Sequence, residues 1–105
     1  MKNVKTIISP VVSTKVGQFK PDSDMTEKLS PVLKDRILRY LESVPDILVG
    51  DCPLKDPVSG EIYERTNIVR EKDGYTWTSH TIYMLRKYDV KLKEEFLRMF
   101  EQGDG

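Results

Sequence analysis

The apolar positions of the chain change their spacing from one segment to the next, and each spacing predicts a type of secondary structure. Leu33, Ile37 and Leu41 recur every four residues, as on the buried face of an amphipathic helix. Ser30 stands just before this stripe, where its hydroxyl can accept a hydrogen bond from the first turn. A helix over residues 31–43 is therefore expected, with proline at its first position and proline again beyond its end.

Two further apolar stripes near the C-terminus predict two more helices. Ser79 can cap the first of them. Its stripe consists of Ile82, Leu85 and Tyr88. A third helix is expected after Leu92, because two glutamates in its first turn interact favourably with the helix dipole. Its apolar residues are Phe96, Leu97 and Phe100.

Short apolar or β-branched runs between turn residues predict strands. Residues 47–49 read Ile-Leu-Val, and an uninterrupted apolar run of this length is typical of a strand buried on both faces. Residues 61–71 and 75–78 are further candidates. They are joined by Asp73 and Gly74, a pair that tolerates the positive φ angles of a two-residue hairpin turn. The sequence thus predicts a β-hairpin ahead of the second helix.

The predicted hairpin determines which side chains face the same way. With a two-residue turn, Lys72 pairs with Tyr75 and Arg70 pairs with Trp77, so these four side chains share one face of the sheet. Tryptophan, tyrosine and arginine are enriched among the residues that dominate binding interfaces. This face is therefore a candidate interaction surface. A single tryptophan in a small sheet is more often a core residue, and that interpretation of Trp77 is the stronger one.

Residues 1–12 are expected to form an edge strand or an extended arm. The segment 4–12 is rich in β-branched residues, but Pro10 cannot donate to a β-ladder, which favours a position at an edge. Ile7 and Ile8 are the candidate contacts of this arm. It could add as an edge strand to a partner protein or to a second copy of the chain, as in a homodimer.

The element order predicts the fold class. A strand, a helix, three strands and two helices are typical of an α+β fold, here a small antiparallel sheet of three or four strands with a single layer of helices on one face. We expect a single domain over residues 1–105. Residues 17–28 have little periodicity and predict a flexible connection, and residues 102–105 predict a disordered tail.

Composition and charge narrow the function classes. Seventeen Lys and Arg residues balance seventeen Asp and Glu residues, whereas a phosphate-binding surface needs a local excess of positive charge. Nucleic acid is therefore a disfavoured partner. No apolar run approaches the roughly 18 residues that a membrane span needs, so no membrane partner is expected. Cys52 is the single cysteine, which fits a reducing, cytoplasmic compartment.

The residue types that carry chemistry are few. Cys52 and His80 form the one conceivable nucleophile pair, with Asp51 or Asp56 to orient the imidazole, but no spacing in the sequence brings them together. A metal site built from Asp46, Asp51, Cys52 and Asp56 lacks the paired spacings of zinc sites and the regular spacing of calcium loops. No phosphate-binding glycine motif occurs either. The sequence therefore predicts no catalytic residue, metal or cofactor.

The residues from Asp73 to Ser79 read as DG-aromatic-x-W-x-S, and they are followed by Lys87-Tyr88 and Glu95-Phe96. This pattern resembles the C-terminal signature of an uncharacterised family of short bacterial proteins. The resemblance implies a hairpin, a helix that ends in K-Y and a final helix, and it implies no catalytic residue. His80 stands where members typically show an acidic residue.

These observations favour a non-enzymatic bacterial protein whose partner is another protein, such as an immunity or antitoxin-like protein or an accessory factor. Two alternatives stay open. One is a small-ligand-binding protein or minor enzyme with a cleft near Cys52 and His80. The other is a nucleic-acid-binding accessory protein.

Overall fold

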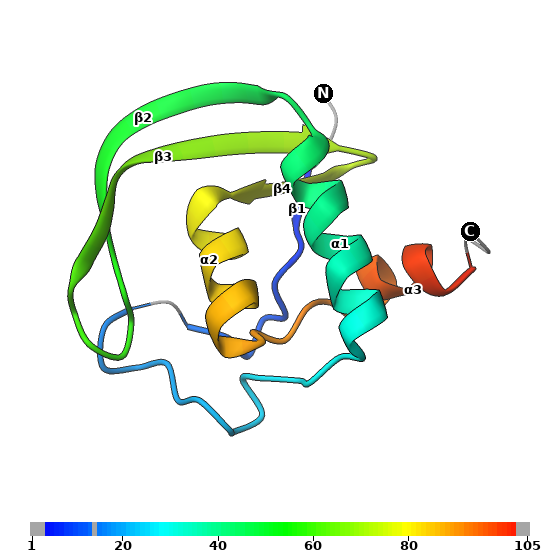
Figure 1. Cartoon of the computed structure of the whole chain (residues 1–105), viewed down its shortest axis with the longest axis horizontal. Helices are drawn as coiled ribbons and strands as arrows, with labels where there is room; N and C mark the ends of the chain where they lie inside the picture. The colour runs from blue at the N-terminus through cyan, green and yellow to red at the C-terminus, as the bar shows by residue number, and fades with distance from the viewer. Residues whose placement is uncertain (1–3, 14, 103–105) are drawn as a thin grey trace.

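The chain forms one four-stranded sheet and three helices, shown in Figure 1. The computed structural model describes residues 4–13 and 15–102. The elements in chain order are β1 (Lys5–Thr6), α1 (Pro31–Ser43), β2 (Asp46–Lys55), β3 (Ile62–Lys72), β4 (Tyr75–Thr78), α2 (Ser79–Tyr88) and α3 (Glu94–Gln102). The predicted α+β class with a small sheet is confirmed.

The helix ends follow local capping chemistry. Ser30 accepts a hydrogen bond from the backbone N–H of Leu33 and Pro31 is the first residue of α1, so the predicted helix and its start are confirmed. The cap of α2 is Thr78 rather than the predicted Ser79, and Thr78 exchanges hydrogen bonds with Thr81. The hydroxyl of Ser79 instead accepts from the backbone N–H of Ile68 on β3.

The hairpin between β3 and β4 has the predicted register. Arg70 pairs with Trp77 and Lys72 with Tyr75. Both turn residues, Asp73 and Gly74, have positive φ angles, as a two-residue turn of this kind requires. The Asp73 carboxylate also accepts a hydrogen bond from Tyr40 of α1 at 2.7 Å. The turn is therefore attached to the first helix.

The sheet has the strand order β1-β4-β3-β2, so β1 and β2 are its edges. The pairs β2–β3 and β3–β4 are antiparallel, whereas β1 is parallel to β4. The sheet is therefore mixed rather than wholly antiparallel. The difference arises because β1 is far from β4 in sequence and its direction is not determined by a hairpin.

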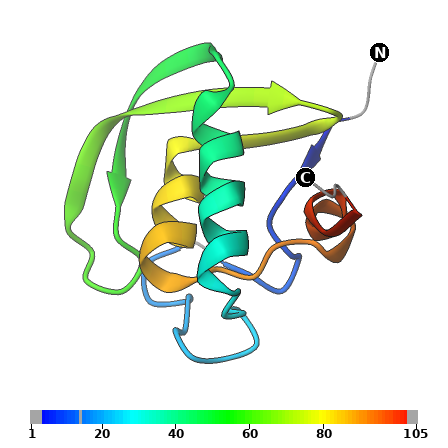
Figure 2. The same ribbon diagram turned by 45° about the vertical axis from the view of Figure 1, so that its right-hand side comes forward.

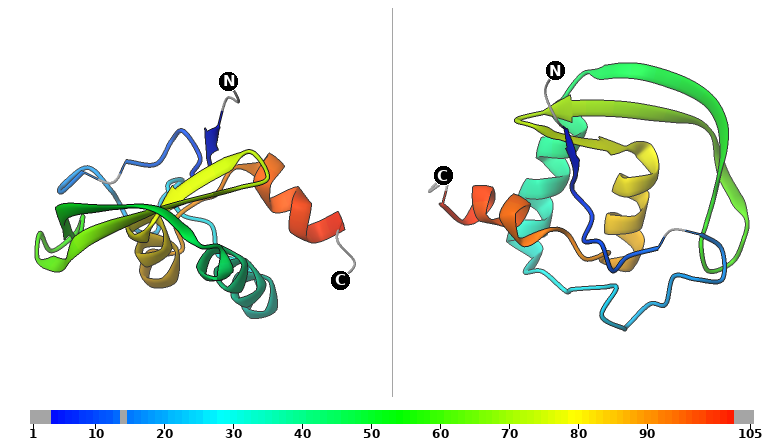
Figure 3. Two further views of the ribbon diagram at one scale, coloured as in Figure 1. Left: turned by 90° about the horizontal axis from the view of Figure 1, so that it is seen from above. Right: turned by 180° about the vertical axis from the view of Figure 1, so that it is seen from behind.

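The helices α1 and α2 lie side by side against one face of the curved sheet, and the N-terminal segment runs along the opposite side (Figures 2 and 3). The indole N–H of Trp77 donates to the carbonyl of Leu41 at 3.1 Å, which joins β4 to α1. The aromatic ring of Tyr40 contacts those of Phe96 and Phe100 and so joins α1 to α3. The core thus lies between the sheet and the helices.

Three segments differ from the sequence-based expectation or extend it. Residues 1–3 of the predicted arm lie outside the described residues; within residues 4–12, Lys5–Thr6 is the only strand, and the next ladder contact is a single bridge from Ile8 to Leu92. In the segment 17–28, Phe19 is buried and Thr26 bridges to Val90, so the connection is anchored at two places, and its mobility stays a prediction. Of the expected tail, Gln102 ends α3 and residues 103–105 lie outside the described residues.

Candidate functional site

The face of the sheet predicted to bind a partner is turned toward the helices. Trp77 is 2% exposed, and the ring of Tyr75 packs edge-on against Phe96. Arg70 is half-buried with its Nε bonded to the carbonyl of Val44, and the exposed Lys72 places its Nζ over the Tyr40 ring. Trp77 therefore cannot contribute to a surface. The predicted register of the β3–β4 hairpin is confirmed, but α1 and α3 pack on the face of the sheet that carries these side chains.

The N-terminal arm is also used inside the fold. Ile7 is fully buried and Ile8 half-buried. The backbone N–H of Lys93 donates to the carbonyl of Ile7 at 2.8 Å, and that of Lys5 donates to the carbonyl of Gly74 at 3.0 Å. Ile7 is therefore a core residue rather than an exposed contact. The other edge strand of the described sheet is β2, on the opposite side.

Cys52 and His80 lie on different sides of β3. Cys52 is exposed on β2, the outer strand, whereas His80 is in the first turn of α2, which follows β4. The imidazole Nδ1 of His80 forms a hydrogen bond with the Tyr63 hydroxyl. Burial lowers the pKa of His80, against the opposing charge of Asp56, so its ring is neutral at pH 7. Within residues 4–13 and 15–102, no three His, Cys, Asp or Glu side chains gather as metal ligands.

The carboxylate of Asp56 joins the β2–β3 connection to α2, and these contacts were not predicted from the sequence. Asp56 is 1% exposed, and both its oxygens accept hydrogen bonds. The donors are the hydroxyls of Tyr83 (2.6 Å) and Tyr88 (2.7 and 2.8 Å), Lys87 Nζ (3.1 Å) and the backbone N–H groups of Val58 (2.8 Å) and Ser59 (3.0 Å). We call this group of residues the Asp56 cluster.

The charge state of Asp56 follows from these contacts. Burial alone would raise the pKa of its carboxyl, but the hydrogen bonds from the two tyrosines and the turn amides lower that pKa below its usual range. An ionised carboxylate with every oxygen already accepting bonds is a weak general base. The Asp56 cluster therefore has the properties of a structural clamp.

A stack of rings extends from the Asp56 cluster along α2. Tyr63 of β3 lies flat on Tyr83, with ring centres 3.6 Å apart and an angle of 8° between the planes. The His80 ring is nearly parallel to Tyr63 at 5.9 Å. Burial raises the pKa of Tyr63, and the neighbouring Tyr83 and Asp56 add to this shift, so the phenol stays protonated. The stack forms an aromatic wall between β3 and α2.

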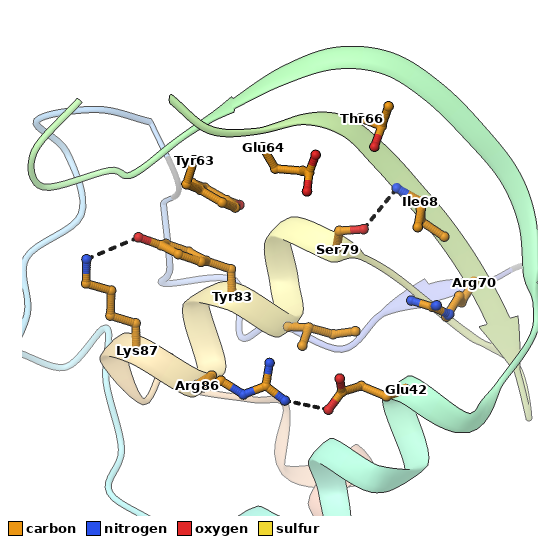
Figure 4. Close-up of a pocket in the computed structure, with 11 residues that line it drawn as sticks. Glu42, Tyr63, Glu64, Thr66, Ile68, Arg70, Ser79, Tyr83, Arg86 and Lys87 are labelled. Carbon is orange, nitrogen blue, oxygen red and sulfur yellow. Dashed lines mark hydrogen bonds and ion pairs between the residues drawn. The ribbon is translucent and has the colours of Figure 1, made fainter. Parts of the chain in front are cut away.

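This wall closes one end of a groove of about 410 Å³, shown in Figure 4. Ile68 of β3 and Ile82 of α2 line it, together with charged side chains from three elements. The charged lining consists of Glu42, Glu64, Arg70, Arg86 and Lys87. Arg86 is paired with Glu42, and Lys87 with Asp56. The groove is therefore a mixed apolar and polar site of the size that small ligands occupy.

The second surface feature is the outer edge of β2. Ile47, Leu48 and Val49 are 61%, 62% and 54% exposed, which corrects the expectation of a strand buried on both faces. In the ten-residue strand only Leu54 is buried. The β2–β3 ribbon is curved, and β2 is its outer strand (Figure 1). An exposed apolar run on an open sheet edge is the kind of surface that other chains pair with.

The sequence contained partial signals for these features. Lys87 follows Tyr83 by four residues and is followed directly by Tyr88, so the three side chains lie on adjoining parts of one helix surface. Residues 56–60 contain aspartate, proline, serine and glycine, a composition typical of a turn, and an aspartate that begins a turn often accepts hydrogen bonds from the backbone that follows it. Nothing local, however, indicated that the turn and the helix meet, since they are 27 to 32 residues apart.

No protein-family model, curated protein or solved structure matches this chain. In the part of the chain that the structure describes, no helix is long and apolar enough to cross a membrane. The two surface features of the described chain that could bind another molecule are the β2 edge and the groove.

Proposed function

We propose that the protein is a non-enzymatic interaction protein that binds an extended segment of a partner protein along the open edge of β2. The exposure of Ile47, Leu48 and Val49 on that edge is the observation that carries this proposal. The C-terminal pattern implies a bacterial protein and the single cysteine fits a cytoplasmic one, a setting that suits an immunity or antitoxin-like protein or an accessory factor.

The β2 edge has both the backbone groups and the apolar side chains that the addition of a partner strand requires. Its unpaired backbone groups can continue the ladder into a partner, and its side chains provide apolar contacts on both faces. Leu48 and Val49 pair regularly with Val69 and Ile68 of β3 and point to opposite faces of the sheet. Register shifts between Asp46 and Leu48 and between Asp51 and Leu54 leave residues 48–51 as the stretch of β2 that pairs regularly with β3. A partner strand is therefore expected to pair regularly with β2 over about four residues.

The charges that flank the run indicate the partner's chemistry. Asp46 and Asp51 stand on either side of the three apolar residues, and both are exposed. A partner strand with an apolar centre and flanking Lys or Arg residues would complement them. Two copies of this chain paired through the same run would bring their aspartates together, which disfavours a homodimer at this edge. The proposed occupant is a strand of a different protein.

Affinity capture with matched variants tests the proposal. Val49→Lys places a charge in the apolar run without disturbing the core, because the side chain is exposed. Val32→Lys is the control. Among the large apolar residues that the structure describes, Val32 is the most exposed, and it lies on α1, away from the β2 edge. We expect a partner retained by the wild type and by Val32→Lys to be lost by Val49→Lys.

Two further measurements keep the test specific. Hydrogen exchange of the purified complex should show new protection at the amides of residues 48–51, as expected when a strand is added. Equal capture by all three proteins would contradict the proposal. A concentration-dependent dimer of the isolated wild type that Val49→Lys abolishes would also contradict it, because the edge would then bind a second copy.

A further inference from the structure

One arginine in the groove is oriented by the fold but has no carboxylate partner. The Nε of Arg70 donates to the carbonyl of Val44 at 2.7 Å, which fixes the plane of the guanidinium. Among the described residues no ion pair involves Arg70, whereas the other two cations of the groove, Arg86 and Lys87, each have one. The terminal N–H groups of Arg70 are thus available to a ligand in the groove.

The remaining lining supplies a hydroxyl and an apolar surface. Ser79 Oγ accepts from the backbone N–H of Ile68 at 3.0 Å, which leaves its own proton free to donate. In Figure 4, Arg70 lies at one end of the groove and the Tyr63–Tyr83 stack at the other, with Ser79 between them. The apolar contribution comes from Ile68 and Ile82. The groups that can donate to a ligand without giving up an ion pair, Arg70 and Ser79, therefore lie away from the ring end, where Lys87 is already bonded to Tyr83.

We propose that this groove binds a carboxylate that carries an aromatic or alkyl group. The carboxylate accepts a forked pair of hydrogen bonds from Arg70 and one from Ser79, since planar guanidinium groups match carboxylates in this way. The apolar part lies over Ile68 and Ile82 and extends toward the tyrosine stack. Such a ligand is either a free acid or the C-terminal residue of a polypeptide.

The two glutamates of the groove lining limit how much negative charge a ligand can carry. Glu64 lines the groove without an ion-pair partner among the described residues, and its charge opposes an anionic ligand. Glu42 is paired with Arg86, so its charge is largely balanced. A single carboxylate is therefore favoured over a multiply charged anion. The groove is distinct from the β2 edge, so the two proposals can fail independently.

Binding is tested by titrating isotope-labelled protein with N-acetylphenylalanine and, as the uncharged control, with N-acetylphenylalaninamide. We expect saturable shifts in the amide resonances of residues 66–70 and 79–83 with the acid and none with the amide. The titration extends to about 10 mM, where a weak, fragment-sized ligand still saturates its site. Absence of saturable shifts with the acid, or equal shifts with the amide, would overturn the proposal.

Three variants assign the binding to Arg70. Arg70→Gln should weaken binding of the acid by at least about tenfold, the usual effect of losing a charge-assisted hydrogen bond. Arg65→Gln, on the same strand but outside the groove lining, should change it by less than about twofold. Glu64→Gln should strengthen binding a few-fold because a repulsive charge is removed. Unchanged affinity of a folded Arg70→Gln protein would refute the assignment.

Two more probes distinguish the ligand sources. A short acetylated peptide that ends in phenylalanine with a free carboxylate represents a protein C-terminus, and 3-phenylpropionate represents a free acid. Tighter binding of the peptide than of N-acetylphenylalanine would identify a polypeptide end as the ligand. Tighter binding of 3-phenylpropionate would identify a small acid.

Discussion

Asp56 shows how one side chain can connect two parts of a small protein. Its carboxylate is almost inaccessible to solvent, and it bonds the turn after β2 to the last turns of α2. A buried carboxylate costs free energy unless its oxygens are satisfied, and here both of them are. The cluster therefore stabilises the arch of the β2–β3 ribbon that forms one wall of the groove.

Asp56→Asn should lower the free energy of unfolding by about 3 kcal/mol, because an amide NH₂ replaces an acceptor among several donors. Urea denaturation followed by the fluorescence of Trp77 measures this change. Asp51→Asn, an exposed aspartate on the same ribbon, should change the stability by less than about 0.5 kcal/mol. Equal effects of the two substitutions would show that the cluster does not clamp the turn.

The same carboxylate predicts a pH dependence. The pKa of Asp56 is lowered in the folded state, so its contribution to stability is complete above the pKa of an unfolded aspartate, about 4. That contribution is lost as the pH falls further toward the folded-state pKa. The stability difference between the wild type and Asp56→Asn should therefore be constant from about pH 5 to 8 and shrink below about pH 4. A difference that does not change down to pH 2 would contradict this assignment.

At the scale of elements, the β3–β4 hairpin depends on the backbone of its turn. Gly74 has a φ of +84°, and a Cβ added there would meet no atom within 4 Å. Gly74→Ala should therefore cost about 1 to 2 kcal/mol through backbone strain alone. Gly50→Ala is the control, because the φ of Gly50 is not in the left-handed region and an added Cβ would lie 3.9 Å from the carbonyl oxygen of Asn67. The free energy of unfolding of this variant should change by no more than about 0.5 kcal/mol. Thermal unfolding of the two variants compares them, and a similar loss in both would exclude strain as the cause.

The hairpin also shows which elements the sequence can predict. Its turn, its register and the start of α1 depend on residues that are neighbours in the chain, and all three were predicted correctly. The exposure of Ile47 to Val49 was not, because an apolar run predicts burial without saying what covers it. The Asp56 cluster and the groove were missed for a related reason. Their residues come from elements far apart in the sequence, and the tertiary packing of β3, α1 and α2 brings them together.

At the scale of the whole molecule, the N-terminal segment completes the structure. It pairs with the hairpin at Lys5 and is bonded to the link before α3 at Ile7, so it connects the two halves of the C-terminal region. Of the two edge strands, β1 belongs to a segment that is bonded within the fold at Lys5 and Ile7, whereas β2 carries the exposed apolar run. This asymmetry explains why a partner is proposed at β2 rather than at the arm.

The substitution Ile7→Ala tests this division of roles. Ile7 is fully buried, so losing most of its side chain should lower the free energy of unfolding by about 3 kcal/mol, whereas Val4→Ala, at a partly exposed position, should cost less than about 1 kcal/mol. Urea denaturation measures both. A partner that binds at β2 should still be captured by the folded Ile7→Ala protein, because the two edges lie on opposite sides of the sheet. Loss of the partner at unchanged stability would instead place the interface on the arm.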